Sequence, residues 1–550
     1  MRDSDKTQGA QFRFNRNANI GEAGAEDDDE FLFQSFFETG DYQELRNISS
    51  PMRIVVGRTG SGKTALLRNL RHNEEHVIEI NPESLSLNFI ANNDVLRFFE
   101  GIGLKLDLFY ALLWKHMLAV ELLRSKYQLT TEEKTTSWIG SVRDSLRKKD
   151  QTKERALSYL KDWGDKFWIE TDHRVKELTT KLATELSAES GLKVADFSMG
   201  AKAAASMSAE QKLEVLHRGQ RVVNSVQVRE LSDVIRFLNE DVFVDSQKPY
   251  FITIDKLDEN WVEDKLRFKL IRALIEAVRA FQKVQNVKVI VALRHDLLRK
   301  VFEETADAGF QEEKYEASFL RLRWTKSQIE ELVDRRVAVL VRAQYTSRSL
   351  KLRDLFPERV NGRTFFVDYF IQRIALRPRD AILFVNECIS RSESQGQVKA
   401  ATIFEAERDY SRLRRKSLVY EWQGLYPSLE NSLRLLERMP AEFRLSALHQ
   451  ETIDQVIEAL AGLDGNSSDQ CTRAAVRFMN SETASRHGVI AEIFRALFDV
   501  GAVGLRLEGG SGPIWSQDST APPASQLKPS TKAIVHPMFW QALATQFNNT

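Results

Sequence analysis

Short apolar runs, most of them followed by a stretch with helical spacing, mark two separate parts of the chain. The runs are rich in Val, Ile, Leu and Phe and lie at 53–56, 76–80, 250–255, 287–293 and, more briefly, 318–323. Apolar residues at helical spacing follow at 64–70, 263–282 and 326–342. Continuous apolar runs are typical of parallel strands, whose two faces are both buried. The pattern therefore predicts a parallel α/β sheet assembled from residues 31–87 and 246–345.

The rest of the chain has a mainly helical pattern. Residues 88–245 are predicted to form a large helical insertion between the two parts of the sheet, and residues 346–400 a helical lid. The last part, 401–550, has a helical pattern as far as residue 460. It ends in two strand-like runs, 503–507 and 533–536, joined by a loop rich in Gly, Pro and Ser. We therefore expect it to end in a winged-helix-like α+β module.

The first residues differ in composition from the rest of the chain. Residues 1–30 are polar, contain several Gly and Asn, and end in an acidic run. This composition predicts a disordered tail. The aromatic side chains in 31–37 then predict a short helix that lies on the next domain.

Length, charge and cysteine usage limit the class of protein. The chain has 550 residues, too many for one hydrophobic core, which favours several domains. Lys and Arg total 78, as do Asp and Glu, so the net charge neither favours nor opposes nucleic acid. No run of about 18 apolar residues occurs, and the N-terminus lacks the apolar core of a secretory signal. With Cys388 and Cys471 as its only cysteines, the chain fits the reducing cytoplasm, away from membranes.

The most informative motif lies between the run at 53–56 and the helical pattern at 64–70. Its residues, called the glycine-rich loop below, are Gly57, Arg58, Thr59, Gly60, Ser61, Gly62, Lys63 and Thr64. They match G-x-x-x-x-G-K-S/T, in which the glycines let successive backbone N–H groups face phosphate oxygens. Lys63 is expected to reach the β- and γ-phosphates, and the Thr64 hydroxyl to ligate Mg²⁺. The motif predicts a P-loop nucleoside triphosphatase that binds ATP or GTP, and we expect ATP.

A second acidic group should complete the magnesium site. Asp255 ends the apolar run at 250–255 and is the candidate for the Mg²⁺ shell, directly or through water. Many ATPases carry an acid at the next position, where this chain has Lys256. Glu259 is our first candidate for the base that polarises the attacking water, and Asp258 the second.

With both motifs placed, the chain resembles AAA+/STAND-type bacterial P-loop ATPases, a family often met among mobile-element and antiphage defence genes. The blocks that carry the resemblance are GRTGSGKT, IDKLDENW, VALRHDLL, FLRLRWTKSQIEELVDRR, LRPRDAILFVNE, LFDVGAVGL and VHPMFW. The resemblance implies that Arg294 senses the γ-phosphate and that Arg379 is the lid arginine that contacts it. It also implies a homo-oligomer. Family members commonly read D-D-L-D where this chain reads D-K-L-D, which predicts slow turnover.

Three functions fit these residues. The first is an ATPase switch or motor that acts on a protein effector, such as a neighbouring gene product, or on DNA. The second is a DNA-binding initiator or regulator that ATP licenses, and salt-dependent DNA binding strengthened by ATP would distinguish it. The third is a scaffold that binds nucleotide with little hydrolysis. The basic run at 412–416 fits either contact with phosphates or a solvated helix face, and we favour the solvated face.

Overall fold

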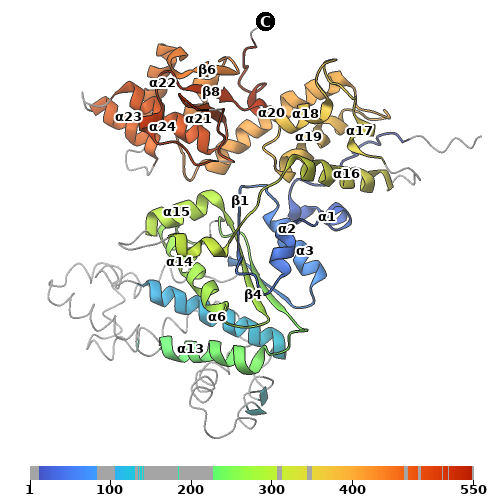
Figure 1. Cartoon of the computed structure of the whole chain (residues 1–550), viewed down its shortest axis with the longest axis vertical. Helices are drawn as coiled ribbons and strands as arrows, with labels where there is room; N and C mark the ends of the chain where they lie inside the picture. Colours follow the sequence, from blue (N-terminus) through green and yellow to red (C-terminus); the bar gives the residue numbers. More distant parts are fainter. Residues whose placement is uncertain are drawn as a thin grey trace, which may run out of the picture. The chain divides into compact units, whose positions relative to one another are not determined.

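The computed structural model describes residues 12–82, 106–129, 227–259, 261–305, 312–342, 350–463, 469–480, 485–510, 512–517 and 519–547, with a few single positions in 134–184. The chain forms two compact units (Figure 1). The sheet unit consists of Glu38–Arg58 and Lys63–Leu322, and the helical unit of Met1–Phe37, Thr59–Gly62 and Arg323–Thr550. In the described parts of both units, no helix is long and apolar enough to cross a membrane.

The sheet unit is built on five parallel strands, as the apolar runs predict. They are β1 (Ile54–Gly57), β2 (Val77–Ile80), β3 (Tyr250–Ile254), β4 (Val287–Arg294) and β5 (Phe319–Arg321). Their order in the sheet is β2-β3-β4-β1-β5. Every residue of β1 and β3 is buried, which explains why these strands lack a polar alternation. The predicted parallel sheet is confirmed.

The direction of each crossover explains where the helices of the sheet unit lie. The chain moves one way along the sheet from β1 through α3 (Lys63–Asn73) to β2, and the opposite way from β3 through α14 (Asp264–Phe281) to β4. Because such crossovers are right-handed, α3 and α14 must cover opposite faces, as Figure 1 shows. The β4-to-β5 connection, through α15 (His295–Thr305), runs the same way as that of α14 and places α15 on the same face.

Most of the predicted helical insertion, 88–245, lies outside the described residues. Its described parts are helical: α6 (Asp107–Tyr127), α13 (Gln227–Phe237) and a short π-helix, η3 (Leu238–Val242). α6 packs along α14, and α13 packs on α6. The indole N–H of the buried Trp114 in α6 donates to the Leu270 carbonyl of α14 at 2.9 Å. These helices share one hydrophobic core with the sheet.

A lysine is fully buried in the middle of this sheet. Lys288, in β4, is 0% exposed, and its ammonium group donates to the Glu44 and Asn47 carbonyls at 2.7 and 2.8 Å. These carbonyls end the short helix α2 (Gly40–Arg46). Burial and the neighbouring Arg53 lower the pKa of Lys288 to about 7, against a smaller opposing effect of Glu44.

We expect Lys288 to make the stability of the sheet unit depend on pH. A lysine in the unfolded chain titrates near pH 10.4, so the unfolded state binds more protons than the folded state between about pH 7 and 10. Stability should therefore rise with pH across this window, by at most about 1.4 kcal/mol per pH unit. Urea unfolding of Lys288→Met should lack this rise, while exposed Lys283→Met should keep it. Equal pH slopes in all three proteins would contradict the assignment.

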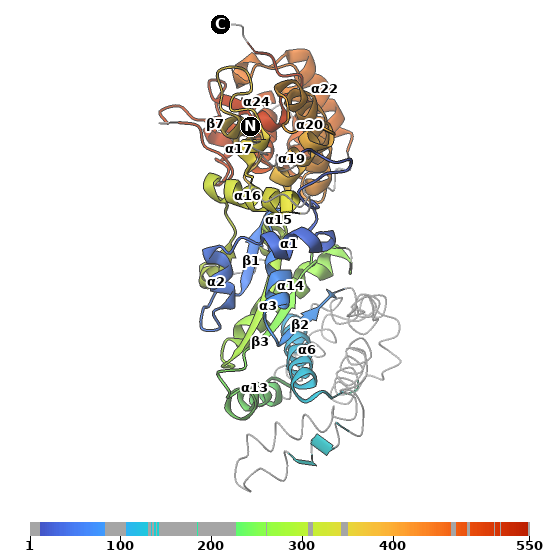
Figure 2. The ribbon, with the colours of Figure 1, turned by 90° about the vertical axis from the view of Figure 1, so that its right-hand side faces the viewer.

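The helical unit has its own hydrophobic core. Its main helices in the lid region are α16 (Lys326–Arg342), α17 (Leu352–Leu355), α18 (Phe366–Gln372), α19 (Pro378–Ser390) and α20 (Ala400–Trp422). α19 packs along α20, and the two lie side by side in Figure 2 as in Figure 1. Pro378 is the first residue of α19, where its missing N–H leaves no helical hydrogen bond unmade. By its contacts, α16 belongs to this unit, although the apolar pattern grouped it with the sheet.

The prediction of a disordered tail over 1–30 is wrong for the described residues 12–30. Phe14 and Ile20 are 1% and 0% exposed and lie in the core of the helical unit. Asp28 pairs with Arg336 of α16 at 2.5 Å, and both side chains are buried. The next residues form α1 (Asp29–Ser35), which packs on α16. The polar composition did not reveal this order, because a few apolar side chains are enough to pack a short segment against the core of the helical unit.

The last part of the chain combines helices with a small antiparallel sheet. The strands are β6 (Glu442–Arg444), β7 (Val503–Arg506) and β8 (Lys532–Val535), in the order β6-β8-β7. The principal helices are α21 (Leu429–Leu433), α22 (Gln450–Ala461), α23 (Gln470–Asn480) and α24 (Arg486–Asp499). β6 corrects the prediction that the chain is helical as far as residue 460. Its three residues form a strand only because β8, remote in sequence, pairs with them.

Candidate functional site

The glycine-rich loop begins in the last residue of β1 and runs into the first turn of α3. Lys63 and Thr64 are the first two residues of that helix, whose N-terminus carries a partial positive charge. Gly60 and Gly62 have φ angles of +78° and +95°, which favour glycine. The loop is divided between the two units, because the contacts of Thr59–Gly62 place these four residues in the helical unit.

On the side of the sheet unit, the Lys63 and Thr64 side chains meet the end of β3. The Thr64 hydroxyl donates to Asp255 Oδ2 at 2.8 Å. Lys63 Nζ donates to the carbonyls of Gly57 and Arg58 at 3.1 and 3.2 Å. Burial lowers the pKa of Lys63, against the opposing charges of Asp255 and Asp258, and burial also raises the pKa of Asp255. A partly buried cation beside a hydroxyl and a carboxylate suits the binding of phosphate together with a divalent metal ion.

The topology of the sheet explains why these residues come together. β4 lies between β1 and β3, and Arg294 at its end is the register partner of Gly57. The chain leaves β1 toward one edge of the sheet and leaves β4 toward the other edge. In parallel α/β sheets, ligands bind at the carboxyl ends of strands where such a divergence occurs. Gly57, Lys63, Asp255 and Arg294 all lie at this point.

The residues after Asp255 form a tight turn. Lys256 has a φ angle of +61°, an uncommon conformation for a lysine, and its N–H donates to Asp255 Oδ1 at 2.9 Å. Its side chain pairs with Glu259 at 3.7 Å, and both side chains are about two-fifths exposed, at 42% and 41%. The structure thus brings Glu259 near Lys256 in the turn that follows β3.

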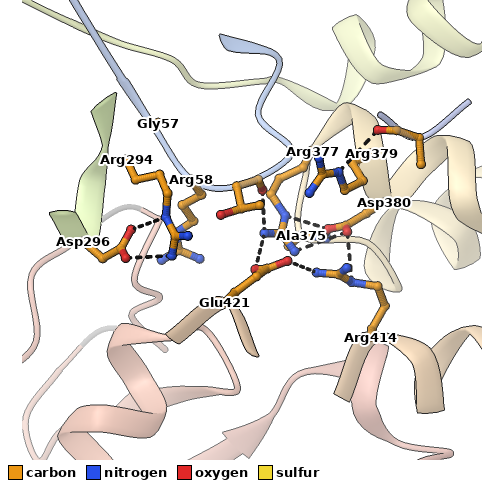
Figure 3. A network of polar contacts seen from close by, with 12 residues as sticks. Gly57, Arg58, Arg294, Asp296, Ala375, Arg377, Arg379, Asp380, Arg414 and Glu421 are labelled. Carbon is orange, nitrogen blue, oxygen red and sulfur yellow. Dashed lines mark hydrogen bonds and ion pairs between the residues drawn. The ribbon is translucent and has the colours of Figure 1, made fainter. Parts of the chain in front are cut away.

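Arg294 is held between two carboxylates. It contacts Asp258 at 3.2 Å and Asp296 at 2.7 Å, and Figure 3 shows the Asp296 pair. Burial alone would lower the pKa of Arg294, but these two carboxylates outweigh burial and raise it. Asp258, the second candidate base, is therefore paired with Arg294.

In the helical unit, four charged residues, three of them buried and the fourth partly buried, form a closed ring (Figure 3). Arg377 pairs with Asp380 at 2.8 Å and Glu421 at 3.3 Å, and Arg414 pairs with the same two acids at 3.1 Å each. We call these four residues the charge ring. Arg377 Nη1 also donates a hydrogen bond to the Thr59 carbonyl of the glycine-rich loop at 2.9 Å.

The charge ring was missed by sequence reasoning, which singled out Arg379. Arg379 Nε donates to the Ala23 carbonyl at 3.3 Å, and its main-chain N–H donates to the Gly60 carbonyl at 3.3 Å. In the basic run at 412–416, Arg412 and Lys416 are exposed as predicted, but Arg414 is an exception, because it is 1% exposed. The only signal for the ring in the sequence is the Arg377 to Asp380 spacing of one helical turn.

The magnesium ligands expected from the sequence are Thr64 and Asp255. Their hydrogen bond brings one hydroxyl and one carboxylate oxygen together, a donor set that suits Mg²⁺ when phosphate oxygens and water supply the other ligands. No cluster of three or more His, Cys, Asp or Glu that could hold a metal occurs among the described residues. The chemistry of the donors thus fits a metal bound jointly with a phosphate ligand.

Comparison with known protein families finds a similarity over a part of the chain. Residues 327–419 match the FunZ-associated C-terminal helical domain. The matched segment begins in α16 and ends within α20, so it contains Arg377, Asp380 and Arg414 but not Glu421. The curated proteins include no match to the chain. The chain is therefore similar to this domain over a part of its helical unit.

Proposed function

We propose that this chain binds ATP and Mg²⁺ at the glycine-rich loop and hydrolyses ATP, as an AAA+/STAND-like P-loop ATPase. The observation that carries the proposal is the contact of Thr64 with Asp255 at 2.8 Å, which joins the loop after β1 to the carboxylate after β3. Lys63 lies beside this pair at the start of α3. This combination supports binding of phosphate and metal at the diverging strand ends.

Each residue of the loop has a role in this proposal. The N–H groups of the loop and the ammonium group of Lys63 bind the phosphates, and Thr64 and Asp255 hold Mg²⁺. Mg²⁺ supplies positive charge to the phosphate oxygens when it is bound. Arg294 and Arg379 report whether the γ-phosphate is present, the first from the end of β4 and the second from the first turn of α19.

The base is proposed to be Glu259, with Asp258 as the alternative. Asp258 is paired with Arg294, whose side chain is only 18% exposed, whereas Glu259 pairs with the exposed Lys256. Exposed ion pairs contribute about 0–1 kcal/mol, so Glu259 can leave Lys256 at little cost. Glu259 would then take a proton from the water that attacks the γ-phosphorus, and the bond from that phosphorus to the ADP oxygen would break.

Hydrolysis should depend on Glu259 while ATP binding should not. In Glu259→Gln, ATP turnover is expected to fall roughly a hundredfold or more, the usual scale for losing a general base. Calorimetry should find ATP still bound with Mg²⁺. Glu263→Gln, the same change at an exposed position nearby, should keep the parent rate. Unchanged turnover in Glu259→Gln would exclude it as the base and favour Asp258, and parent turnover near background would favour a nucleotide-binding scaffold.

For the partner, we propose a protein effector, with the helices and small sheet at the C-terminal end acting as a winged-helix-like module. Basic side chains of this module are paired with neighbouring acids in Lys528–Glu508, Lys532–Glu442, Arg506–Glu442, Arg486–Asp454 and Arg495–Glu492. Paired cations contribute less to the release of counterions on which DNA binding depends. A homo-oligomeric switch or motor, in line with the antiphage resemblance, is thus proposed ahead of a DNA-binding regulator.

A further inference from the structure

Three successive carbonyl groups of the glycine-rich loop accept hydrogen bonds from residues of the helical unit. The Thr59 carbonyl accepts from Arg377 Nη1 at 2.9 Å, and the Ser61 carbonyl accepts from Trp324 Nε1 at 2.9 Å. Between them, the Gly60 carbonyl accepts from the main-chain N–H of Arg379 at 3.3 Å. One face of the loop is therefore held along three peptide groups in a row.

The geometry of the peptide group determines what this does to the other face. No cis peptide bond occurs among the described residues, and in a planar trans peptide the C=O and N–H bonds point in opposite directions. Fixing the carbonyls of Thr59, Gly60 and Ser61 thus turns the N–H groups of Gly60, Ser61 and Gly62 away from the three donor residues. Successive N–H groups that share a direction, with the positive φ angle of Gly60 between them, form a concave anion-binding site.

The three residues that donate to these carbonyls are fixed by their own contacts within the helical unit. Arg377 is fixed by the charge ring, in which two arginines and two carboxylates balance each other, and its side chain is 8% exposed. A Cβ atom added at Gly60 would lie 2.7 Å from the Arg379 Cβ, so the loop lies directly against the start of α19. Trp324 is partly buried and packs against the core of the helical unit.

We infer that Arg377 and Trp324 are positioning residues. The hydrogen bonds that they donate to the carbonyls of the glycine-rich loop orient its amide N–H groups for binding phosphate. This inference rests on the proposed function, because it assumes that the loop binds nucleotide phosphates. Neither residue is expected to contact the nucleotide. Both lower the cost of binding by removing loop conformations in which the amides point elsewhere.

Trp324→Phe tests the inference, because it removes one N–H donor and keeps an aromatic ring. The probes are Mg-ATP, Mg-ADP and inorganic pyrophosphate, all of which need the amide site. Their affinities should fall together by roughly 3- to 10-fold, the usual scale for one hydrogen bond. Trp540→Phe is the matched control, since Trp540 Nε1 donates to the Val535 carbonyl at 3.0 Å in the same unit. It should bind all three ligands as the parent does.

A second readout distinguishes positioning from a general loss of structure. Hydrogen exchange of peptides that cover residues 57–64 should be faster in free Trp324→Phe than in the free parent, with peptides of α16 and α20 unchanged. Arg379→Ala should behave differently, lowering the preference for ATP over ADP, because its proposed side-chain contact is with the γ-phosphate. Parent affinities and parent exchange rates in Trp324→Phe would overturn the inference. Failure of the parent to bind Mg-ATP would instead overturn the proposed function.

Discussion

Replacing Lys63 by alanine is expected to lower the affinity for Mg-ATP by roughly a hundredfold or more, while the protein stays folded. Charge-assisted hydrogen bonds contribute about 1.5–3 kcal/mol each, and Lys63 would make at least two with the phosphates. Within the protein, Lys63 donates only to the Gly57 and Arg58 carbonyls in the described structure. Burial lowers its pKa, so the charged form is not favoured by its surroundings, and its removal should cost little stability.

Isothermal calorimetry measures the affinity, and thermal unfolding checks the fold. Arg71→Ala is the matched control, because Arg71 lies on the same helix, is 65% exposed and pairs with Glu79. Its ATP affinity should equal that of the parent. If Lys63→Ala bound ATP as tightly as the parent does, the assignment of the phosphate site would be wrong. If it failed to fold, the Lys63 ammonium group would have a structural role that its contacts do not indicate.

Asp380→Asn is expected to destabilise the helical unit by about 3–5 kcal/mol, the usual result of breaking a buried ion pair. Asp380 is 0% exposed, accepts from Arg377 Nε at 2.8 Å and lies 3.1 Å from Arg414 Nε. Burial alone would raise the pKa of Asp380, but the two arginines outweigh it and lower the pKa. Without this carboxylate, two buried guanidinium groups share only Glu421, and one positive charge is left uncompensated.

Calorimetric unfolding should show the loss as a fall in the melting temperature on the order of 10 °C for a unit of this size. Arg414→Met in the same chain should restore part of it, because the ring then holds one cation and one anion again. Asp409→Asn, which breaks a pair that is 51% exposed on the carboxylate side, should change stability by less than about 0.5 kcal/mol. An unaltered melting temperature in Asp380→Asn would mean that the ring does not stabilise this unit.

The charge ring should also make the stability of the helical unit depend on pH in acid. Because the pKa of Asp380 lies below its ordinary value, its contribution to stability is present at neutral pH. It should begin to decline only when the pH falls below about 4, the ordinary value for aspartate, and should be lost at lower pH. Melting temperatures measured between pH 7 and acid pH should show this decline in the parent and should not show it in Asp380→Asn.

The residues that the sequence reveals are those whose role depends on local pattern. Strands β1 and β3 are continuous apolar runs because both faces of a parallel sheet are buried, and α16 was predicted with its observed bounds, Lys326–Arg342. The glycine-rich loop is visible because its glycines and Lys63 occupy fixed positions along the chain. Asp255 could be placed because strand-end acids follow an apolar run.

The tertiary structure alone decided which distant residues meet. Arg414 and Glu421 come from α20 and join Arg377 and Asp380 of α19, so no local pattern in the sequence could pair all four. β6, the packing of Phe14 and the hydrogen bonds that Arg377 and Trp324 donate to the glycine-rich loop depend in the same way on partners remote in sequence. The physical reason is that burial and hydrogen bonding reward contacts in space. A sequence displays only those contacts whose partners lie within a few residues or repeat with the period of a helix or strand.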